Sequence, residues 1–300
     1  MRQLAGRRRS RTRESTRSRE DAVAEEGVIY VAMGGRFVAE AVLSAVSVRR
    51  HMPSLPITLF TDSPPVGERA FDQVVEISRS GPRPHRDKLV GMLRSPYERT
   101  LFLDTDTFLG ADVSPLFGTL ADYDLLASLD RGYHDRYPEG SGVPDAFREF
   151  NLGVVFYRRS SAMLQSLERS LVLYDRPEMR DGNDQPPFRL ATYGSELKVV
   201  VLTSEYNCRF ANFGHLSGEV KVLHGRIPRA DNTEAALAAV LARINRSTVP
   251  RVFVAGRVYA LAQNRVRFGR PYYPQRVASL FPSSLPYNFK ALRRRLRGWA

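Results

Sequence analysis

The sequence has a single cysteine and no long apolar run, and both shortages exclude classes of protein. Cys208 is the only cysteine among 300 residues, so no disulfide can form within the chain and nothing indicates an oxidising compartment. No apolar stretch approaches the roughly 18 residues that a membrane-spanning helix requires. Three arginines at residues 7–9 resemble the start of a signal peptide, but no apolar segment follows them. We therefore expect a cytoplasmic protein.

Acidic residues are missing from one end of the chain. Residues 251–300 contain eleven Lys or Arg and no acid, and residues 1–26 contain eight Arg against five acids. The net charge of +13 therefore belongs to the ends. We expect residues 1–26 to form a disordered arm, because so few apolar side chains cannot offset the ordering entropy. With 43% hydrophobic residues overall, the chain can form one catalytic domain at 27–250, followed by a basic appendage at 251–300.

Apolar runs of strand length alternate with helical periodicity in the middle of the chain. Residues 28–31 predict a buried strand, and apolar residues then recur at helical spacing over 37–46. Such alternation predicts an α/β fold with a mainly parallel mixed sheet and helices on both faces. The other expected strands are 57–60, 74–77, 100–103, 125–129, 152–156, 199–202 and 220–223, and the other expected helices are 87–94, 160–174 and 232–244.

The most informative motif is Asp104-Thr105-Asp106, which follows the apolar run at 101–103. In extended backbone, residues i and i+2 face the same way, so both carboxylates could reach one divalent cation. Ligands of open α/β sheets bind at the carboxyl ends of the strands. Asp122 and Asp124 have the same spacing but precede an apolar run, so we expect them to form a solvated turn. The spacing alone is common by chance, and the position after a strand is what favours a metal site.

Four other polar signals lie beside predicted strands. Lys88 could contact phosphate or sugar oxygens, or it could be an exposed helical lysine. Asn151 begins a buried strand, and Asp184 and Gln185 lie in a polar turn; all three could also be ordinary loop residues. His224 ends an apolar strand, as the acidic pair does, and neutral imidazole is a good transition-metal ligand.

In this order and spacing, the motifs resemble the retaining glycosyltransferases of family 8, the group that includes glycogenin and bacterial lipopolysaccharide galactosyltransferases. The resemblance extends over about two thirds of the chain, from residue 28 to 226. It implies the GT-A-type nucleotide-diphospho-sugar transferase fold. It also implies a metal-dependent hexosyltransferase that moves a sugar from a nucleotide-diphosphate donor, a UDP-sugar, to a glycan or lipid-linked acceptor with retention of configuration. The segments that carry it are Lys88, 101–106, 151–154, 184–185, 206–207 and 224–225.

The resemblance also implies roles for individual residues. Asp104, Asp106 and His224 would be the ligands of Mn²⁺ or Mg²⁺. Asp184 and Gln185 would lie beside the sugar on the face where the reaction occurs. The residues implied in binding the donor or its nucleotide are Ala32, Met33, Gly34, Phe37, Lys88, Asp104, Thr105, Asn151, Asp181 and Arg226.

The sequence departs from the family pattern at two places. Family members carry a longer segment after the histidine, with a glycine, a lysine and a Pro-Trp pair, whereas Gly225 directly follows His224 and no Trp appears there. Arg226 or Arg229 would then supply the cation that binds the diphosphate. Phe37 occupies a place where relatives often have tyrosine.

The basic ends leave other partners and functions open. Apolar residues recur at helical spacing among the basic residues of 289–299, which predicts an amphipathic helix that either lies on an anionic membrane or packs on the domain. Arg-rich ends could bind nucleic acid non-specifically, although the polar strand ends would then be unexplained, and we expect no specific nucleic-acid partner. Met33-Gly34-Gly35-Arg36 suggests a sugar-phosphate nucleotidyltransferase, but the fuller glycine-rich signature of that group is absent.

Overall fold

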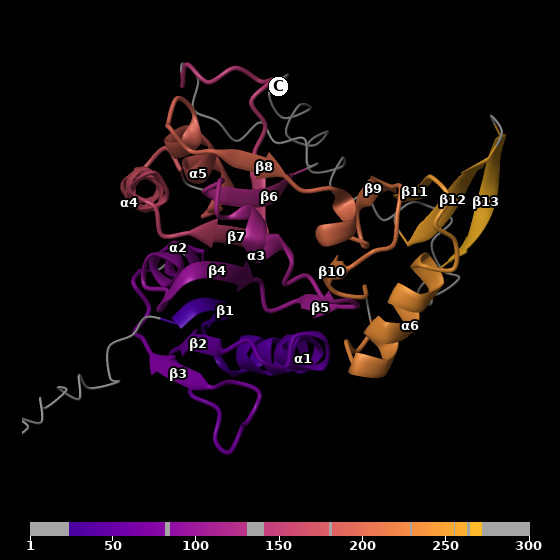
Figure 1. Cartoon of the computed structure of the whole chain (residues 1–300), viewed down its shortest axis with the longest axis horizontal. Coiled ribbons are helices and arrows are strands. Elements are labelled where there is room, and N and C mark those ends of the chain that lie inside the picture. The colour runs from indigo at the N-terminus through magenta and orange to yellow at the C-terminus, as the bar shows by residue number, and fades with distance from the viewer. Residues whose placement is uncertain are drawn as a thin grey trace, which may run out of the picture.

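A seven-stranded sheet forms the centre of the computed structural model (Figure 1), which describes residues 24–81, 85–130, 141–179, 182–228, 230–254, 256–262 and 265–271. The strands β1 to β4 are mutually parallel, as are β6 and β8, whereas β7 runs antiparallel to both of its neighbours. The predicted mainly parallel mixed sheet is therefore confirmed. In spatial order the strands are β3 (Gln73–Glu76), β2 (Ile57–Thr61), β1 (Ala24–Ala32), β4 (Tyr97–Leu103), β7 (Phe150–Arg158), β6 (Leu125–Leu129) and β8 (Val199–Val201).

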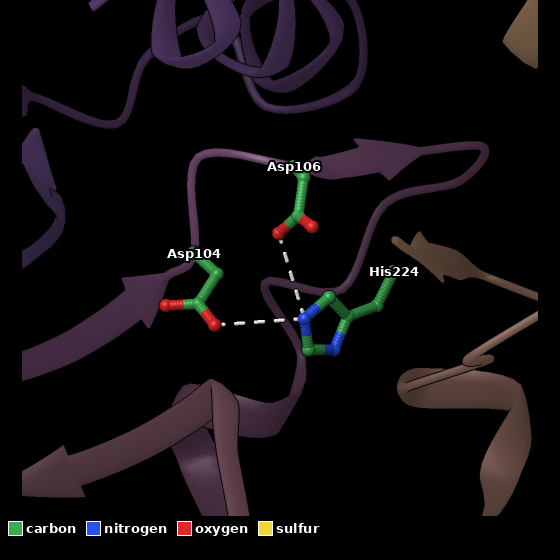
Figure 2. Close-up of side chains that lie close together, drawn as sticks. All are labelled: Asp104, Asp106 and His224. Atoms are coloured by element: carbon green, nitrogen blue, oxygen red, sulfur yellow. Dashed lines mark ion pairs between the residues drawn. The ribbon is translucent and has the colours of Figure 1, made fainter. Parts of the chain in front are cut away.

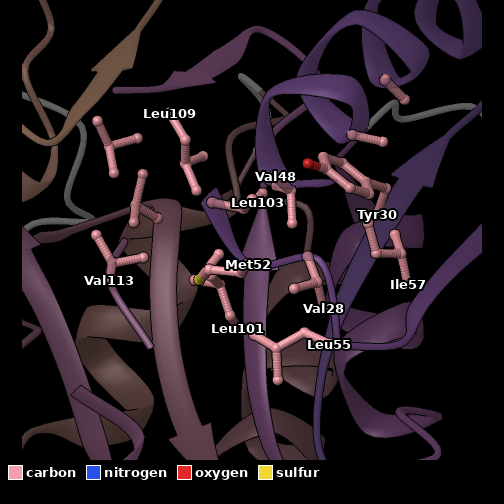
Figure 3. Packing of buried hydrophobic residues seen from close by; sticks show 14 of the residues in the cluster. Val28, Tyr30, Val48, Met52, Leu55, Ile57, Leu101, Leu103, Leu109 and Val113 are labelled. Carbon is pink, nitrogen blue, oxygen red and sulfur yellow. The ribbon is translucent and has the colours of Figure 1, made fainter. Parts of the chain in front are cut away.

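Helices cover both faces of this sheet, as predicted. Successive side chains of a strand point to opposite faces, so Tyr30 of β1 belongs to one core and Ile29 to the other. Figure 3 shows part of the first core, where Tyr30 and Leu101 pack together with Val48. Burial on both faces explains why these strands read as continuous apolar runs. The first core includes side chains of α1 (Gly35–His51) and α3 (Leu116–Thr119), and the second those of α2 (Arg86–Leu93), α4 (Ser161–Tyr174) and α5 (Gln185–Thr192).

The helix ends follow local chemistry, with one departure from the prediction. Ser160 caps α4, because its hydroxyl oxygen accepts a hydrogen bond from the Met163 amide at 3.3 Å. The polar stretch that we expected to be a turn instead leads into α5, which begins at Gln185. Two prolines occupy its first turn. Backbone amides there have no partner within the helix, so proline, which lacks an amide hydrogen, loses no hydrogen bond.

Two smaller antiparallel sheets lie to one side of the central sheet, together with α6 (Glu234–Ile244) (Figure 1). A ribbon pairs β5 (Thr107–Leu109) with β10 (Val222–His224). The other sheet contains β9 (Phe213–Leu216), β11 (Arg251–Val254), β12 (Arg257–Ala262) and β13 (Arg265–Pro271). Because β11 pairs with β9, the first strand after the expected boundary at residue 250 is continuous with the expected catalytic domain.

Two expectations about exposed segments are wrong. Residues 24–26, placed in the disordered arm, belong to β1. Asp124, placed in a solvated turn, is buried: its carboxylate pairs with Arg158 at 2.8 Å and accepts the Lys198 amide at 2.9 Å. Four predictions concern residues outside the described ranges. They are the rest of the expected arm, at 1–23, the amphipathic helix at 289–299, and the roles of Asp181 and Arg229. Within the described ranges, none of the helices has the length and apolarity needed to cross a membrane.

Candidate metal and donor site

Asp104, Asp106 and His224 converge on one point, as the sequence predicts (Figure 2). Nε2 of His224 lies 3.5 Å from Oδ2 of Asp104 and 3.6 Å from Oδ1 of Asp106. One ligand atom from each side chain lies within 4.8 Å of the others. Asp104 follows β4 of the central sheet, whereas His224 ends β10 of the ribbon. The candidate metal site therefore lies where the central sheet meets the ribbon.

The acidic pair converges for a different reason from the one expected. Residues 104–106 are not extended: the Thr107 amide donates to the Asp104 carbonyl at 3.2 Å and closes a turn. The ribbon then places Thr107 opposite His224, and the Gly225 amide donates to the Asp106 carbonyl at 2.9 Å. Gly225 has a φ of 115°, which side chains disfavour. A turn and a strand pairing, rather than the pleat of one strand, bring the three ligands together.

The charges around this point favour a cation. Four carboxylates, those of Glu40, Asp104, Asp106 and Asp184, are linked by ion pairs to three cations, Lys88, Arg226 and the more exposed Arg36. The cluster thus has more negative than positive groups before His224 is considered. Carboxylate oxygens suit hard divalent cations, and an imidazole completes a mixed set. The residues present therefore fit Mn²⁺ or Mg²⁺.

Lys88 lies between two carboxylates, so it is not the exposed helical lysine that we had left open. Its Nζ is 2.9 Å from Oδ1 of Asp104 and 2.9 Å from Oδ2 of Asp184. Burial opposes the charged amine, but the two carboxylates outweigh burial and raise the pKa of Lys88. Burial also opposes the charged form of Asp104, yet the Lys88 ammonium holds the pKa of that carboxyl well below its usual range. One buried ammonium thus connects a predicted metal ligand to a predicted catalytic carboxylate.

Arg226 connects the candidate metal ligands to helix α1. Its Nη1 lies 3.0 Å from Oδ2 of Asp106, while its other nitrogens donate to both oxygens of Glu40, with Nε to Oε1 at 2.8 Å. The Glu40 hydrogen bond raises the pKa of Arg226 against the effect of burial. Thr105 donates to Glu40 at 3.2 Å. Sequence reasoning missed Glu40, whose only local signal is its place one helical turn after Phe37, on the same helix face.

The loop after β1 is held by an ion pair that the sequence did not predict. Oδ1 of Asp62 accepts the Gly34 amide, and Oδ2 accepts Nε of Arg79 at 3.0 Å. Arg79 also donates to the Met33 carbonyl at 3.2 Å. Burial would raise the pKa of Asp62, but the Arg79 hydrogen bond lowers it. Ala32 is buried beside this loop.

Phe37 lies close to the charged cluster, in the first turn of α1. Its ring is 41% exposed, and its centroid lies 5.9 Å from Cζ of Arg226. Because β1 and β4 are parallel neighbours, the loop after β1 and the metal ligands lie at the same edge of the central sheet. The structure therefore brings the predicted nucleotide-binding loop and the predicted metal ligands to one edge.

Asn151 and Gln185 lie on the other side of His224. Asn151 begins antiparallel β7, so it reaches the edge where β4 ends, and its Nδ2 donates to Oε1 of Gln185 at 3.0 Å. Gln185 also donates to two buried carboxylates, Asp130 and, at 2.9 Å, Glu149. No role was predicted for either acid, although Asp130 directly follows β6 and so repeats the strand-end position of Asp104.

A pocket opens beside the two buried amides Asn151 and Asn207. Phe213 and Phe253 supply apolar walls, and Arg209 supplies a cation that pairs with Asp130 at 3.1 Å. The lining thus combines three apolar side chains with five polar ones. The remaining lining residues are Ser128, Leu129 and Asn212.

The comparisons with known proteins found structural neighbours only. No protein-family model and no curated protein matches the chain. An active-site mutant of LgtC superposes with a TM-score of 0.49 and 18% identity, over 67% of this chain and 88% of that one. The galactosyltransferase LgtC in complex with donor and acceptor sugar analogues gives 0.47 and 18%, over 67% and 87%. The glycosyltransferase GlyE of Streptococcus pneumoniae gives 0.45 and 16%, over 63% and 47%.

All three neighbours are glycosyltransferases, the class of enzyme that the motifs resemble. The function of this chain is argued below from its own site.

Proposed function

We propose that this chain is a GT-A-type glycosyltransferase similar to family 8. It would use a divalent metal to move a hexose from a UDP-sugar to a glycan or lipid-linked acceptor with retention. The observation that carries the proposal is the convergence of Asp104, Asp106 and His224 within 4.8 Å at the carboxyl edge of the sheet. Lys88 and Arg226 support it, because they bring two cations to the same edge.

The donor diphosphate would lie beside the candidate metal ligands and Arg226, which form one charged cluster. When bound by Asp104, Asp106 and His224, Mn²⁺ or Mg²⁺ supplies Lewis-acid stabilisation of the charge on the departing diphosphate. Arg226 adds a second positive charge, and its planar guanidinium suits two phosphate oxygens at once. It would thus replace the lysine that family members carry later in the chain.

The nucleoside would bind along the loop after β1. The exposed ring of Phe37 offers a surface on which a base can stack, a contact worth on the order of 1–3 kcal/mol. Ala32, Met33 and Gly34 would line the other side, with Thr105 near the ribose. The ion pair between Asp62 and Arg79 would hold this loop in place while the nucleoside binds.

The sugar would lie beside Lys88 and the start of α5, which are in contact with each other. Asp184 and Gln185 would line the face where the anomeric carbon gains positive charge, and a carboxylate there stabilises that charge. Asn151 and Asp181 would hold sugar hydroxyls. Retention requires the acceptor hydroxyl to attack from the face that the diphosphate leaves, and we assign no covalent nucleophile.

The acceptor would enter through the pocket lined by Phe213 and Phe253, because this pocket opens next to Asn151. If residues 289–299 form the basic helix that their pattern predicts, they would bring the enzyme to an anionic membrane that carries a lipid-linked acceptor. Sedimentation with vesicles of anionic lipid tests this part. Equal recovery of the chain with neutral and anionic vesicles would contradict it.

The function is tested first by a screen of nucleotide sugars. A donor that binds only the native state raises the melting temperature, and we expect the largest rise with a UDP-sugar and Mn²⁺ together. Asp106→Asn should abolish metal-dependent turnover without altering the circular dichroism spectrum. Asp122→Asn is the matched control, because Asp122 is exposed and belongs to the other Asp-x-Asp motif.

Two results would contradict the proposal. Full turnover by Asp106→Asn in the presence of a chelator would remove the metal from the reaction. Release of pyrophosphate from a nucleoside triphosphate and a sugar phosphate would identify a nucleotidyltransferase instead.

A further inference from the structure

A line of buried side-chain amides connects His224 to two carboxylates. Nδ1 of His224 lies 2.8 Å from Oδ1 of Asn207. Asn207 donates from Nδ2 to Oδ1 of Asn151 at 2.9 Å, and Asn151 donates from Nδ2 to Oε1 of Gln185 at 3.0 Å. Gln185 in turn donates to Glu149 at 2.9 Å. All five side chains are buried, so water cannot substitute for a lost partner without cost.

The far end of this line determines the orientation of Gln185. An ionised carboxylate accepts hydrogen bonds and cannot donate them. Nε2 of Gln185 faces Asp130 as well as Glu149, so two acceptors require the NH₂ group at that position. The carbonyl oxygen of Gln185 must then point the other way, towards Asn151, which can satisfy it only with its own NH₂ group.

A second contact determines the orientation of Asn151 independently. The backbone amide of Gly153 donates to Oδ1 of Asn151 at 3.2 Å, and a backbone amide cannot accept. Oδ1 of Asn151 is therefore an acceptor, and Asn207 must direct its NH₂ group towards it. The remaining oxygen of Asn207 then faces Nδ1 of His224, and only a protonated Nδ1 can donate to it.

We propose that this amide line holds His224 in the tautomer with its proton on Nδ1, and so directs the Nε2 lone pair towards Asp104 and Asp106. Asn207 is then a positioning residue of the metal site, and Glu149 acts through Gln185 and Asn151 from the opposite end of the line. Partners that orient metal-binding histidines in this way tune metal affinity in other proteins. The inference rests on the proposed function, because it concerns the same metal site.

The tautomer can be measured directly in the metal-free chain. Long-range ¹H–¹⁵N correlation spectra of protein labelled with ¹⁵N-histidine distinguish a protonated ring nitrogen from an unprotonated one. Spectra recorded at increasing pH until they stop changing report the neutral ring, and the signal lost in His224→Gln assigns it. We expect Nδ1 to be protonated and Nε2 to be unprotonated.

The variant Asn207→Leu removes the side-chain amide that contacts His224 and keeps the side-chain volume nearly constant. We expect His224 to lose its single tautomer and the affinity for Mn²⁺ to fall about 10–100-fold. Asn212→Leu is the matched control: Asn212 lines the same pocket, but its side chain is exposed and outside the line. Its Mn²⁺ affinity and its His224 signals should equal those of the wild type.

The outcomes separate this inference from the proposed function. A predominant Nε2–H tautomer in the wild type would overturn the inference whatever the metal affinity. An unchanged spectrum and Mn²⁺ affinity in folded Asn207→Leu would overturn it as well. An Nδ1–H tautomer in a wild-type chain that binds no Mn²⁺ would support the proposed direction of the hydrogen bonds along the amides and refute the metal site.

Discussion

Gly153→Ala would test the position of His224 with a single methyl group. A Cβ built on Gly153 would lie 2.1 Å from Cε1 of His224 and 2.7 Å from each ring nitrogen. The backbone here cannot easily retreat, because the Gly153 carbonyl accepts the Asp104 amide at 2.8 Å within the central sheet. Gly153 is not among the glycines with positive φ, so alanine suits its backbone and only the space is tested.

The size of the effect follows from these distances. Ordinary contact with a Cβ begins at 3.4 Å, so Cε1 must move by about 1.3 Å. The 2.8 Å hydrogen bond between His224 and Asn207 would not survive such a movement. Overpacking costs about 1–3 kcal/mol and a lost hydrogen bond about 0.5–1.5 kcal/mol. We therefore expect Gly153→Ala to lower the free energy of unfolding by roughly 2–4 kcal/mol.

Urea denaturation measures this loss, and titration of the metal-free protein with Mn²⁺ measures the displacement of His224. We expect about 10–100-fold weaker Mn²⁺ binding. Gly118→Ala is the control, because a Cβ there meets nothing within 4 Å, and alanine in a helix should be neutral or slightly stabilising. If Gly153→Ala unfolds at the same urea concentration as the wild type and binds Mn²⁺ equally well, His224 does not pack on Gly153.

Three further predictions concern charge. Lys88→Met leaves the carboxylates of Asp104 and Asp184 without their shared cation, and should lower the unfolding free energy of the metal-free protein by about 3–5 kcal/mol; an unchanged urea midpoint would show that the ion pairs are not formed. Mn²⁺ at about 100 times the wild-type Kd should raise the unfolding free energy of the wild type by about 2.7 kcal/mol, and a chelator should reverse the rise. The same rise in Asp106→Asn at the same Mn²⁺ concentration would contradict the ligand assignment. Burial would raise the pKa of Glu205, but hydrogen bonds from Thr203 and from the Ser217 and Gly218 amides lower it. The stabilisation is then present above the unfolded value of about 4.3 and is lost as pH falls through the lower folded value; Glu205→Gln should show a smaller loss in acid denaturation than the wild type.

The central sheet could be predicted because its strands are buried on both faces. Val28 and Ile29 face opposite cores, yet both are fully buried, so β1 appears in the sequence as an uninterrupted apolar run. The helix α5 could not be predicted in the same way, because its first turn contains two prolines that also signal a turn. The strand β9 was not predicted, because Phe213 and His215 face solvent. Exposed and buried residues alternate in this short strand, so the sequence shows no apolar run there.

The convergence of Asp104, Asp106 and His224 could be predicted because these residues follow apolar runs, whereas the contacts that position His224 could not. Asn207 and His224 are 17 residues apart, and Gln185 and Glu149 are 36 apart. Such contacts depend on how the sheets pack, which residue spacing does not encode. The turn at residues 104–106 shows a related limit of the pattern: the carboxylates converge, but through a hydrogen bond to Thr107 that an extended strand would not make.

The ribbon of β5 and β10 has a consequence for how metal occupancy can be detected. It has only three residue pairs, and it carries His224 at one end, whereas Asp104 directly follows β4 of the central sheet. A cation bound by both residues would connect the short ribbon to the central sheet. Amide hydrogen exchange at Gly110 and Gly225, which donate to Lys221 and Asp106, should therefore slow on Mn²⁺ binding, while exchange within β1 stays constant. Local opening of this ribbon would then report the ion without any sugar donor.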